Sequence, residues 1–225
     1  MSGALIELRR QLKYNFVDDT LLKRAVTHRS KSANNNERLE FLGDSVLNFI
    51  IAAELYERYP RLTEGELTRL RARLVKQETL ARLARRINLG DSLELGGGEF
   101  KSGGHDRDSI LADALEAVFG AVFKDGGHEA ARGVILDLYR SLFDEIVPGT
   151  SDKDPKTQLQ EILQKRLAIT PMYTVLEVTG EAHQQQFLVE CAVPGLATAV
   201  QGRGANRRAA EQDAAAKALA QLAGQ

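Results

Sequence analysis

The sequence has little cysteine and no long run of apolar residues. Its 225 residues contain a single cysteine, Cys191, which excludes an internal disulfide framework and is typical of a chain from a reducing compartment. The longest apolar run, residues 46–53, is interrupted by Asn48 and is too short to cross a bilayer. These absences exclude a disulfide-stapled secreted protein and indicate that the membrane is not a partner.

The sequence also lacks an excess of charge of either sign and an N-terminal targeting pattern. Its net charge is −1, so nucleic-acid binding would need basic residues gathered locally rather than in bulk. Residues 1–7 do not show the charged-then-apolar order of a signal peptide, and we expect a cytoplasmic location. The length suffices for one large domain or two modest ones.

One acidic stretch, residues 36–47, organises the first part of the chain. In a helix, Glu37, Glu40 and Asp44 stand at i, i+3 and i+7 and share one face. The opposite face is predicted to be the core side, with Leu39, Leu42, Val46, Phe49, Ile50 and Ala53. Stacked acids repel by roughly a few tenths of a kcal/mol per pair. A bound divalent cation would relieve this repulsion, whereas a solvated acidic surface is the alternative interpretation.

A second helix repeats this arrangement. Asp113 and Glu116 stand at i and i+3, and the other face carries Leu111, Leu115, Val118 and Val122. Paired acids on facing helices are one way in which helical bundles build a metal site. The two helices together therefore favour a metal site over two unrelated acidic surfaces.

Hydrophobic periodicity predicts two domains: an all-α domain over residues 1–147, a linker over 148–154 and a small α+β domain over 155–225. In the first domain, a capping box of Thr63 and Glu66 begins one helix, and Asn88 is a candidate helix end. A last helix is expected at 130–146. Residues 95–105 are rich in glycine but lack the spacing of a nucleotide-binding loop, so a mobile connector is expected. The second domain follows the order α-β-β-β-α, with segments expected at 156–165, 173–178, 187–193, 196–201 and 206–222.

Residues 37–45, ERLEFLGDS, resemble without a gap the signature of the ribonuclease III family of double-stranded-RNA endonucleases. Residues 27–30, 64–68 and 113–117 extend the resemblance. In the second domain, residues 156–161, the loop around His183 and residues 202–208 are similar to a double-stranded-RNA-binding domain. The resemblance covers nearly the whole chain, in the order of bacterial members with one catalytic domain.

The resemblance implies a homodimeric endoribonuclease that uses Mg²⁺, with Mn²⁺ as a substitute. It implies cleavage of double-stranded RNA to 5′-phosphate and 3′-hydroxyl ends, in the processing of ribosomal and other structured RNA precursors, messenger and transfer RNA included. By motif position, Asp44 and Glu116 would be catalytic, while Glu40, Asp113 and Glu116 would hold the metal. Glu37 and Glu64 match acids at the edge of the catalytic valley. These are oxygen ligands, which Mg²⁺ prefers.

Phe41 lies near the acidic side of its helix, so a monomer would expose a large aromatic ring. A single exposed apolar residue is ordinary, but beside a charged site it is also what an interface anchor looks like. The resemblance implies that this ring enters a pocket of the second subunit, with Gly43 permitting close approach.

The resemblance and the chemistry of A-form RNA together suggest four RNA-binding residues: Gln160, His183, Arg207 and Arg208. The arginine pair begins the last helix, where the helix dipole also favours phosphate. A solvated helix start and a solvent-exposed loop histidine are the alternatives. Ala209 departs from the third basic residue of many bacterial members, which predicts weaker phosphate contact.

Two other functions are compatible with parts of this pattern. A non-catalytic dimeric protein that binds double-stranded RNA would share both domains, but all four acids are present, which argues against it. A helical phosphohydrolase acting on small metabolites would need the first domain alone.

Overall fold

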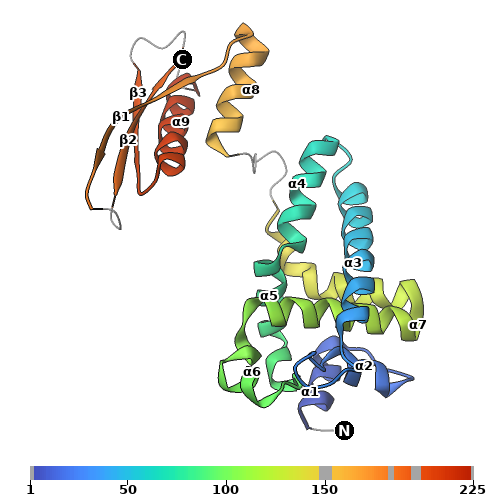
Figure 1. The fold of residues 1–225 in the computed structure, drawn as a ribbon. Coiled ribbons are helices and arrows are strands. Elements are labelled where there is room, and N and C mark those ends of the chain that lie inside the picture. Colours follow the sequence, from blue (N-terminus) through green and yellow to red (C-terminus); the bar gives the residue numbers. More distant parts are fainter. Residues whose placement is uncertain (1–2, 147–153, 182–184, 194–198, 224–225) are drawn as a thin grey trace. The chain divides into compact units, whose positions relative to one another are not determined.

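The computed structural model describes residues 3–146, 154–181, 185–193 and 199–223, which fall into two compact units (Figure 1). The first unit spans Met1–Thr150 and the second spans Ser151–Gln225. Among the residues described, no helix is both long enough and apolar enough to cross a membrane.

The first unit is helical. Its elements are α1 (Gly3–Leu12), α2 (Asp19–Ala25), α3 (Glu37–Arg58), α4 (Glu64–Val75), α5 (Gln77–Arg86), α6 (Gly97–Lys101) and α7 (Asp108–Asp144), with short 3₁₀ turns η1 (Leu89–Ser92) and η2 (Gly104–Asp106). The first half of α7 is buried nearly all round, as expected of a helix at the centre of a core. In Figure 1, α3 crosses α7, and this crossing positions the acids of both helices.

Glycine makes the crossing of α3 and α7 unusually close. A Cβ atom built on Gly43 would lie 1.8 Å from the carbonyl oxygen of Glu116. A Cβ atom built on Gly120 would lie 2.2 Å from the carbonyl oxygen of Leu39. The two backbones are therefore in direct contact, which any larger residue would prevent. The expectation that Gly43 serves approach to a second subunit is wrong, because its open side is filled by α7 of the same chain.

The core face of α3 differs from the prediction in two residues. Leu39, Val46 and Ile50 are buried and Leu42 is partly buried, but Phe49 and Ala53 are exposed. The buried face turns instead toward the α7 side, through Gly43, Leu47, Ile51 and Leu55. The buried face of α3 and its acidic face are thus adjacent rather than opposite. The side of α3 left open carries Phe41, Phe49 and Tyr56.

The helix ends largely follow the predicted capping. Thr63 and Glu66 form the predicted capping box at the start of α4, and Asn88 ends α5 in a left-handed conformation with φ of 53°. The predicted break before residue 130 is a kink at Gly127, with φ of 75°, inside α7. The glycine-rich stretch is more ordered than a plain connector, because it contains α6 and η2.

The second unit has the order α8 (Pro155–Leu167), β1 (Met172–Thr179), β2 (Gln186–Ala192), β3 (Val200–Gly204) and α9 (Arg207–Ala223). Its strands form one antiparallel sheet in the order β1-β2-β3, with Cys191 opposite both Tyr173 and Val200. The buried core residues come from both helices and the sheet: Leu159, Leu163, Cys191, Val193, Val200, Ala214, Ala215 and Ala218. Cys191 is a free, buried thiol.

The third strand lies later than the predicted 196–201. Residues 194–198 are outside the described part of the chain, and β3 instead includes Gly202 and Gly204. A Cβ on Gly202 would lie 2.2 Å from the backbone nitrogen of Ala214 in α9. These glycines let the strand pass directly against the helix, and they also remove the alternation of side chains from which a strand is predicted.

Candidate metal centre and RNA-binding surface

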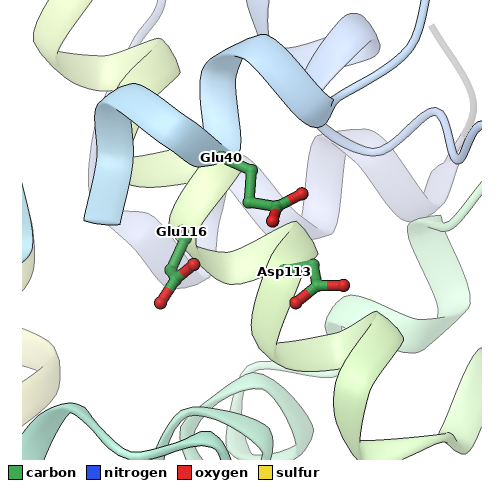
Figure 2. Close-up of side chains that lie close together, drawn as sticks. All are labelled: Glu40, Asp113 and Glu116. Atoms are coloured by element: carbon green, nitrogen blue, oxygen red, sulfur yellow. The ribbon is translucent and has the colours of Figure 1, made fainter. Parts of the chain in front are cut away.

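Three carboxylates converge where α3 crosses α7. Glu40 comes from α3 and Asp113 and Glu116 come from α7, and one carboxylate oxygen of each lies within 4.8 Å of the others (Figure 2). All three are partly buried. Hard oxygen donors gathered from two helices form a set suited to a divalent cation.

The backbone around this cluster is fixed at several points. The close contact of Gly43 with Glu116 sets the distance between the two helices. At the start of α3, the N–H of Asn36 donates to the carbonyl oxygen of Thr27, and its own carbonyl accepts from Glu40. The neighbours of the α7 acids, Ala112, Ala114, Leu115 and Ala117, are buried in the core. The acids therefore project from rigid elements.

The charges of the cluster disfavour its own ionisation. Burial raises the pKa of Glu116 to about 8, with further increases from Asp44, Asp113 and Glu40. Burial also raises the pKa of Glu40, and the nearby Asp113 adds to the increase. The pKa of Asp113 is raised by burial as well, against the lowering effect of His28 and Arg29. A bound cation would reverse these shifts by stabilising the charged forms.

Asp44 lies beside this cluster but outside the group of three. Its side chain is exposed, and the amide of Asn48 donates to Oδ1 of Asp44 at 2.8 Å. Among the charges that raise the pKa of Glu116, Asp44 has the largest effect. Asp44 is thus on the Glu116 side of the cluster.

A pocket of about 500 Å³ lies on the other side of the cluster. It is lined by Glu40 and Asp113 together with residues of the 28–30 loop, the start of α3, the segment before α7 and the first turn of α7: His28, Arg29, Ser30, Asn36, Glu37, Glu99, Arg107, Ser109 and Ile110. The predicted edge acid Glu37 is part of this lining. The pocket lining therefore includes both acidic and basic side chains.

Two further predicted residues belong neither to the cluster nor to the pocket lining. Glu64 begins α4, where its carboxylate accepts a hydrogen bond from the hydroxyl of Thr68 at 2.8 Å. The Phe41 side chain is 79% exposed on α3, as the sequence predicted for a single chain.

The predicted RNA-binding residues lie in the second unit. Gln160 is exposed on α8, and Arg208 is exposed at the start of α9. Arg207 is also exposed, but its Nε donates to Glu211 at 2.8 Å. Glu211 is buried and also accepts from Lys156, so it links the starts of both helices. His183 lies outside the described residues.

His28, Arg29 and Arg107 line the pocket but were not predicted as site residues. His28 and Arg29 belong to a motif of the resemblance, and their spacing alone predicts no role for them. Arg107 offered no signal, because it precedes α7 in a glycine-rich stretch and meets the pocket only through the fold.

The fold and the site define a two-domain protein with an acidic site for a divalent cation on a helical unit and a separate α-β-β-β-α unit. Residues 18–142 match the family described as Ribonuclease-III-like, and residues 155–222 match the double-stranded RNA binding motif. The chain belongs to the ribonuclease III family, whose members depend on divalent metal ions.

Relatives match over nearly the full chain. The sequence is 55% identical to Ribonuclease 3 of Vibrio vulnificus over 222 residues, which is 99% of both chains. It is 56% identical to Ribonuclease 3 of Bordetella petrii over 219 residues, covering 97% of this chain and 86% of the relative.

Two of the solved structures that match are of the same nuclease domain. The nuclease domain of ribonuclease III from Campylobacter jejuni aligns with a TM-score of 0.62 at 40% identity, covering 65% of this chain and 100% of that domain. A second structure of that domain, which concerns flexibility in the region involved in its dimer formation, aligns with a TM-score of 0.60 at 42% identity. It covers 61% of this chain and 97% of that one.

Proposed function

We propose that this chain is a Mg²⁺-dependent endoribonuclease that cuts double-stranded RNA as a homodimer and leaves 5′-phosphate and 3′-hydroxyl ends. The observation that carries the proposal is the convergence of Glu40, Asp113 and Glu116 from two crossing helices. Family membership and the double-stranded RNA binding motif supply the substrate class. A ribonuclease-III-like domain with all its acids is catalytic, so neither an idle RNA-binding protein nor a small-metabolite phosphohydrolase fits as well.

The donor set fits Mg²⁺, with Mn²⁺ as a substitute. Three carboxylates provide hard oxygen ligands, and burial together with the three neighbouring acids raises the pKa of Glu116 to about 8, an environment in which a cation would favour the charged form. When bound, Mg²⁺ would supply an activated water and neutralise charge on the phosphate in the transition state. Glu40, Asp113 and Glu116 would hold the ion.

Asp44 and Glu116 are the proposed catalytic residues. Asn48 holds Oδ1 of Asp44, which leaves Oδ2 open to accept a hydrogen bond from the attacking water. Glu116 belongs to the cluster and also feels the charge of Asp44, so it would touch both the cation and the reacting groups.

The dimer would form through the open side of α3. The Campylobacter jejuni nuclease domain forms a dimer, and in this chain Phe41 projects from α3 without cover. We assign Phe41 as the anchor that enters a pocket of the second subunit. Glu37 and Glu64 would lie at the edges of the catalytic valley, toward the RNA or the other subunit. Two sites related by symmetry would cut the two strands of a duplex.

The second domain would bind the duplex by its shape. Gln160 on α8 and His183 would face minor grooves, while Arg207 and Arg208 would contact phosphates between them. The ion pair with Glu211 holds Arg207 Nε and leaves its Nη atoms for phosphate. The natural substrates would be precursors of ribosomal RNA and other structured transcripts, messenger and transfer RNA included, in the cytoplasm.

A Glu116→Gln variant tests this function. We expect cleavage of a duplex RNA in Mg²⁺ to fall by roughly 10³-fold or more, because the substitution removes a charged ligand while keeping its size. Binding of the duplex in a gel-shift assay should persist. The matched control is Glu129→Gln, since Glu129 is an exposed acid on the same helix, with a side chain 86% exposed. Wild-type protein that binds duplex RNA without cutting it would contradict the proposal.

A further inference from the structure

The pocket beside the acid cluster is lined by both acidic and basic side chains. It shares Glu40 and Asp113 with the cluster, whereas Asp44 is not among its lining residues. It therefore opens on one flank of the candidate metal centre, away from the catalytic carboxylate Asp44. A strand of RNA whose scissile phosphate sits at the cluster must continue past one flank or the other.

Two arginines of this pocket each use only some of their guanidinium donors in the contacts that orient them. Nη1 of Arg29 lies 3.4 Å from Oε1 of Glu37, and the Arg29 side chain is 71% exposed. Nη1 of Arg107 lies 2.7 Å from Oε1 of Glu99, and its Nη2 donates to Ser102 at 3.2 Å. A guanidinium has five N–H donors, so each arginine keeps donors for a further acceptor. Glu37 and Glu99 therefore orient the two arginines and leave guanidinium N–H groups available for another acceptor.

His28 is a third candidate donor in the lining of this pocket. The backbone N–H of Ser30 donates to Nδ1 of His28 at 3.2 Å, and the Ser30 hydroxyl lies 2.8 Å from the same nitrogen. The hydroxyl in turn accepts from the N–H of Gly96 at 2.9 Å. Because Nδ1 accepts a backbone hydrogen bond, the proton of the neutral ring is on Nε2. A Cβ on Gly96 would lie 2.4 Å from the carbonyl oxygen of Ser30, so the loop is held tightly against this segment.

We infer that this flank binds a backbone phosphate of the cleaved RNA strand, next to the scissile phosphate, through Arg29, Arg107 and His28. The inference rests on the function proposed above and deepens it. Guanidinium forks match the geometry of phosphate oxygens, and the mostly exposed Arg29 suits a chain that runs on past the pocket rather than an enclosed small molecule. Without these donors, the charged residues of the lining would all be acids: Glu37, Glu40, Glu99 and Asp113.

The test pairs protein variants with RNA that lacks one charge. Duplexes are made with a single methylphosphonate, which is neutral, at each position flanking one scissile bond. We expect one such position to lower kcat/KM of the wild type by about 10- to 100-fold, the effect of one charge-assisted hydrogen-bonded contact. Arg29→Gln and Arg107→Gln should lower kcat/KM on unmodified RNA to a similar extent. At that one position, the methylphosphonate should cause a smaller further loss in each variant than it causes in the wild type, because one of the contacts to that phosphate is already missing.

Controls separate phosphate contact from support of the loop. Glu99→Gln breaks the ion pair with Arg107 but keeps the arginine, so a loss equal to that of Arg107→Gln would overturn the role of Arg107. Arg10→Gln removes an exposed arginine from α1 and should leave kcat/KM unchanged. The Mg²⁺ concentration for half-maximal rate should stay the same in the variants. Additive losses at every methylphosphonate position would overturn the inference, whereas a wild type that cuts no duplex would contradict the proposed function instead.

Discussion

Glu116 is a carboxyl whose pKa is raised to about 8 from an ordinary value of 4.5, mainly by burial and then by three neighbouring acids. Near neutral pH and without a cation, this side chain holds a proton that the same residue in an unfolded chain has released. Its charge is thus available to a metal only when the metal displaces that proton. Metal affinity and protein stability are therefore linked to pH through this one residue.

The linkage predicts how the metal-free protein responds to pH. The pKa of Glu116 is higher in the folded protein than in the unfolded chain. Its contribution to the free energy of unfolding is therefore full below pH 4.5 and is lost as pH rises through about 8. In EDTA, the free energy of unfolding should fall between these limits by up to about 1.4 kcal/mol per pH unit. Urea denaturation at several pH values measures this slope.

The Glu116→Gln variant is the comparison for that slope. Glutamine does not titrate, so the variant should lose stability more gently over the same pH range. Added Mg²⁺ should stabilise the wild type more at pH 8 than at pH 6, since fewer protons must then be displaced. Equal slopes in the wild type and the variant would show that another group carries the pH dependence.

At the scale of elements, the crossing of α3 and α7 decides where the acids stand. Gly43→Ala should lower the free energy of unfolding by about 3 kcal/mol or more, because its Cβ would overlap the carbonyl oxygen of Glu116. Gly133→Ala is the matched control on α7, where a Cβ would meet nothing within 4 Å. That control should gain about 0.5 to 1 kcal/mol from helix propensity. Similar effects of the two substitutions in urea denaturation would contradict the close crossing.

The acids of both helices could be predicted from the sequence, because i and i+3 spacing survives in any helix. Their convergence within 4.8 Å required the Gly43 and Gly120 contact, and glycine has no side chain from which a periodic pattern could show it. The sequence pattern wrongly placed Phe49 on the core face of α3 for a related reason. Apolar residues on α3 outnumber the positions that one core can cover, so periodicity alone could not tell the core face from an open one.

In the second domain, too, glycine limited what could be predicted from the sequence. Its helix-sheet-helix order followed from alternating residues in β1 and β2, but β3 contains Gly202 and Gly204, which supply no alternation. The packing of α9 on those glycines is a long-range contact that only the fold shows. Arg207 was predicted as an exposed phosphate ligand, yet its partner Glu211 is four residues further on and buried.

For the whole molecule, the uncovered aromatic residues of α3 predict association. Phe41, Phe49 and Tyr56 are 79%, 60% and 69% exposed, and burying them against a second copy would remove a substantial apolar area from water. Phe41→Ala should weaken the dimer by about 2 kcal/mol or more, which is roughly a 30-fold increase in Kd. Sedimentation velocity over a range of protein concentrations measures this change.

Phe100→Ala is the control for that experiment. Phe100 is also 60% exposed, but it stacks on His105 in the α6 segment and not on the open side of α3. Its substitution should leave the dimer Kd unchanged. A Phe41→Ala protein that dimerises as tightly as the wild type would remove Phe41 from the interface.

The contact between the α3 and α7 backbones also limits how this centre can change. Two helices that already touch cannot move closer, so a shortened side chain cannot be compensated by a shift of the scaffold. Replacing Glu40 or Glu116 by aspartate would leave a gap that the fold is unable to close. Glutamate at these two positions thus supplies the side-chain length needed to reach the ion as well as the charge. A redesign of the centre for an ion of another size would have to change the lengths of the side chains, because the distance between the α3 and α7 backbones is fixed.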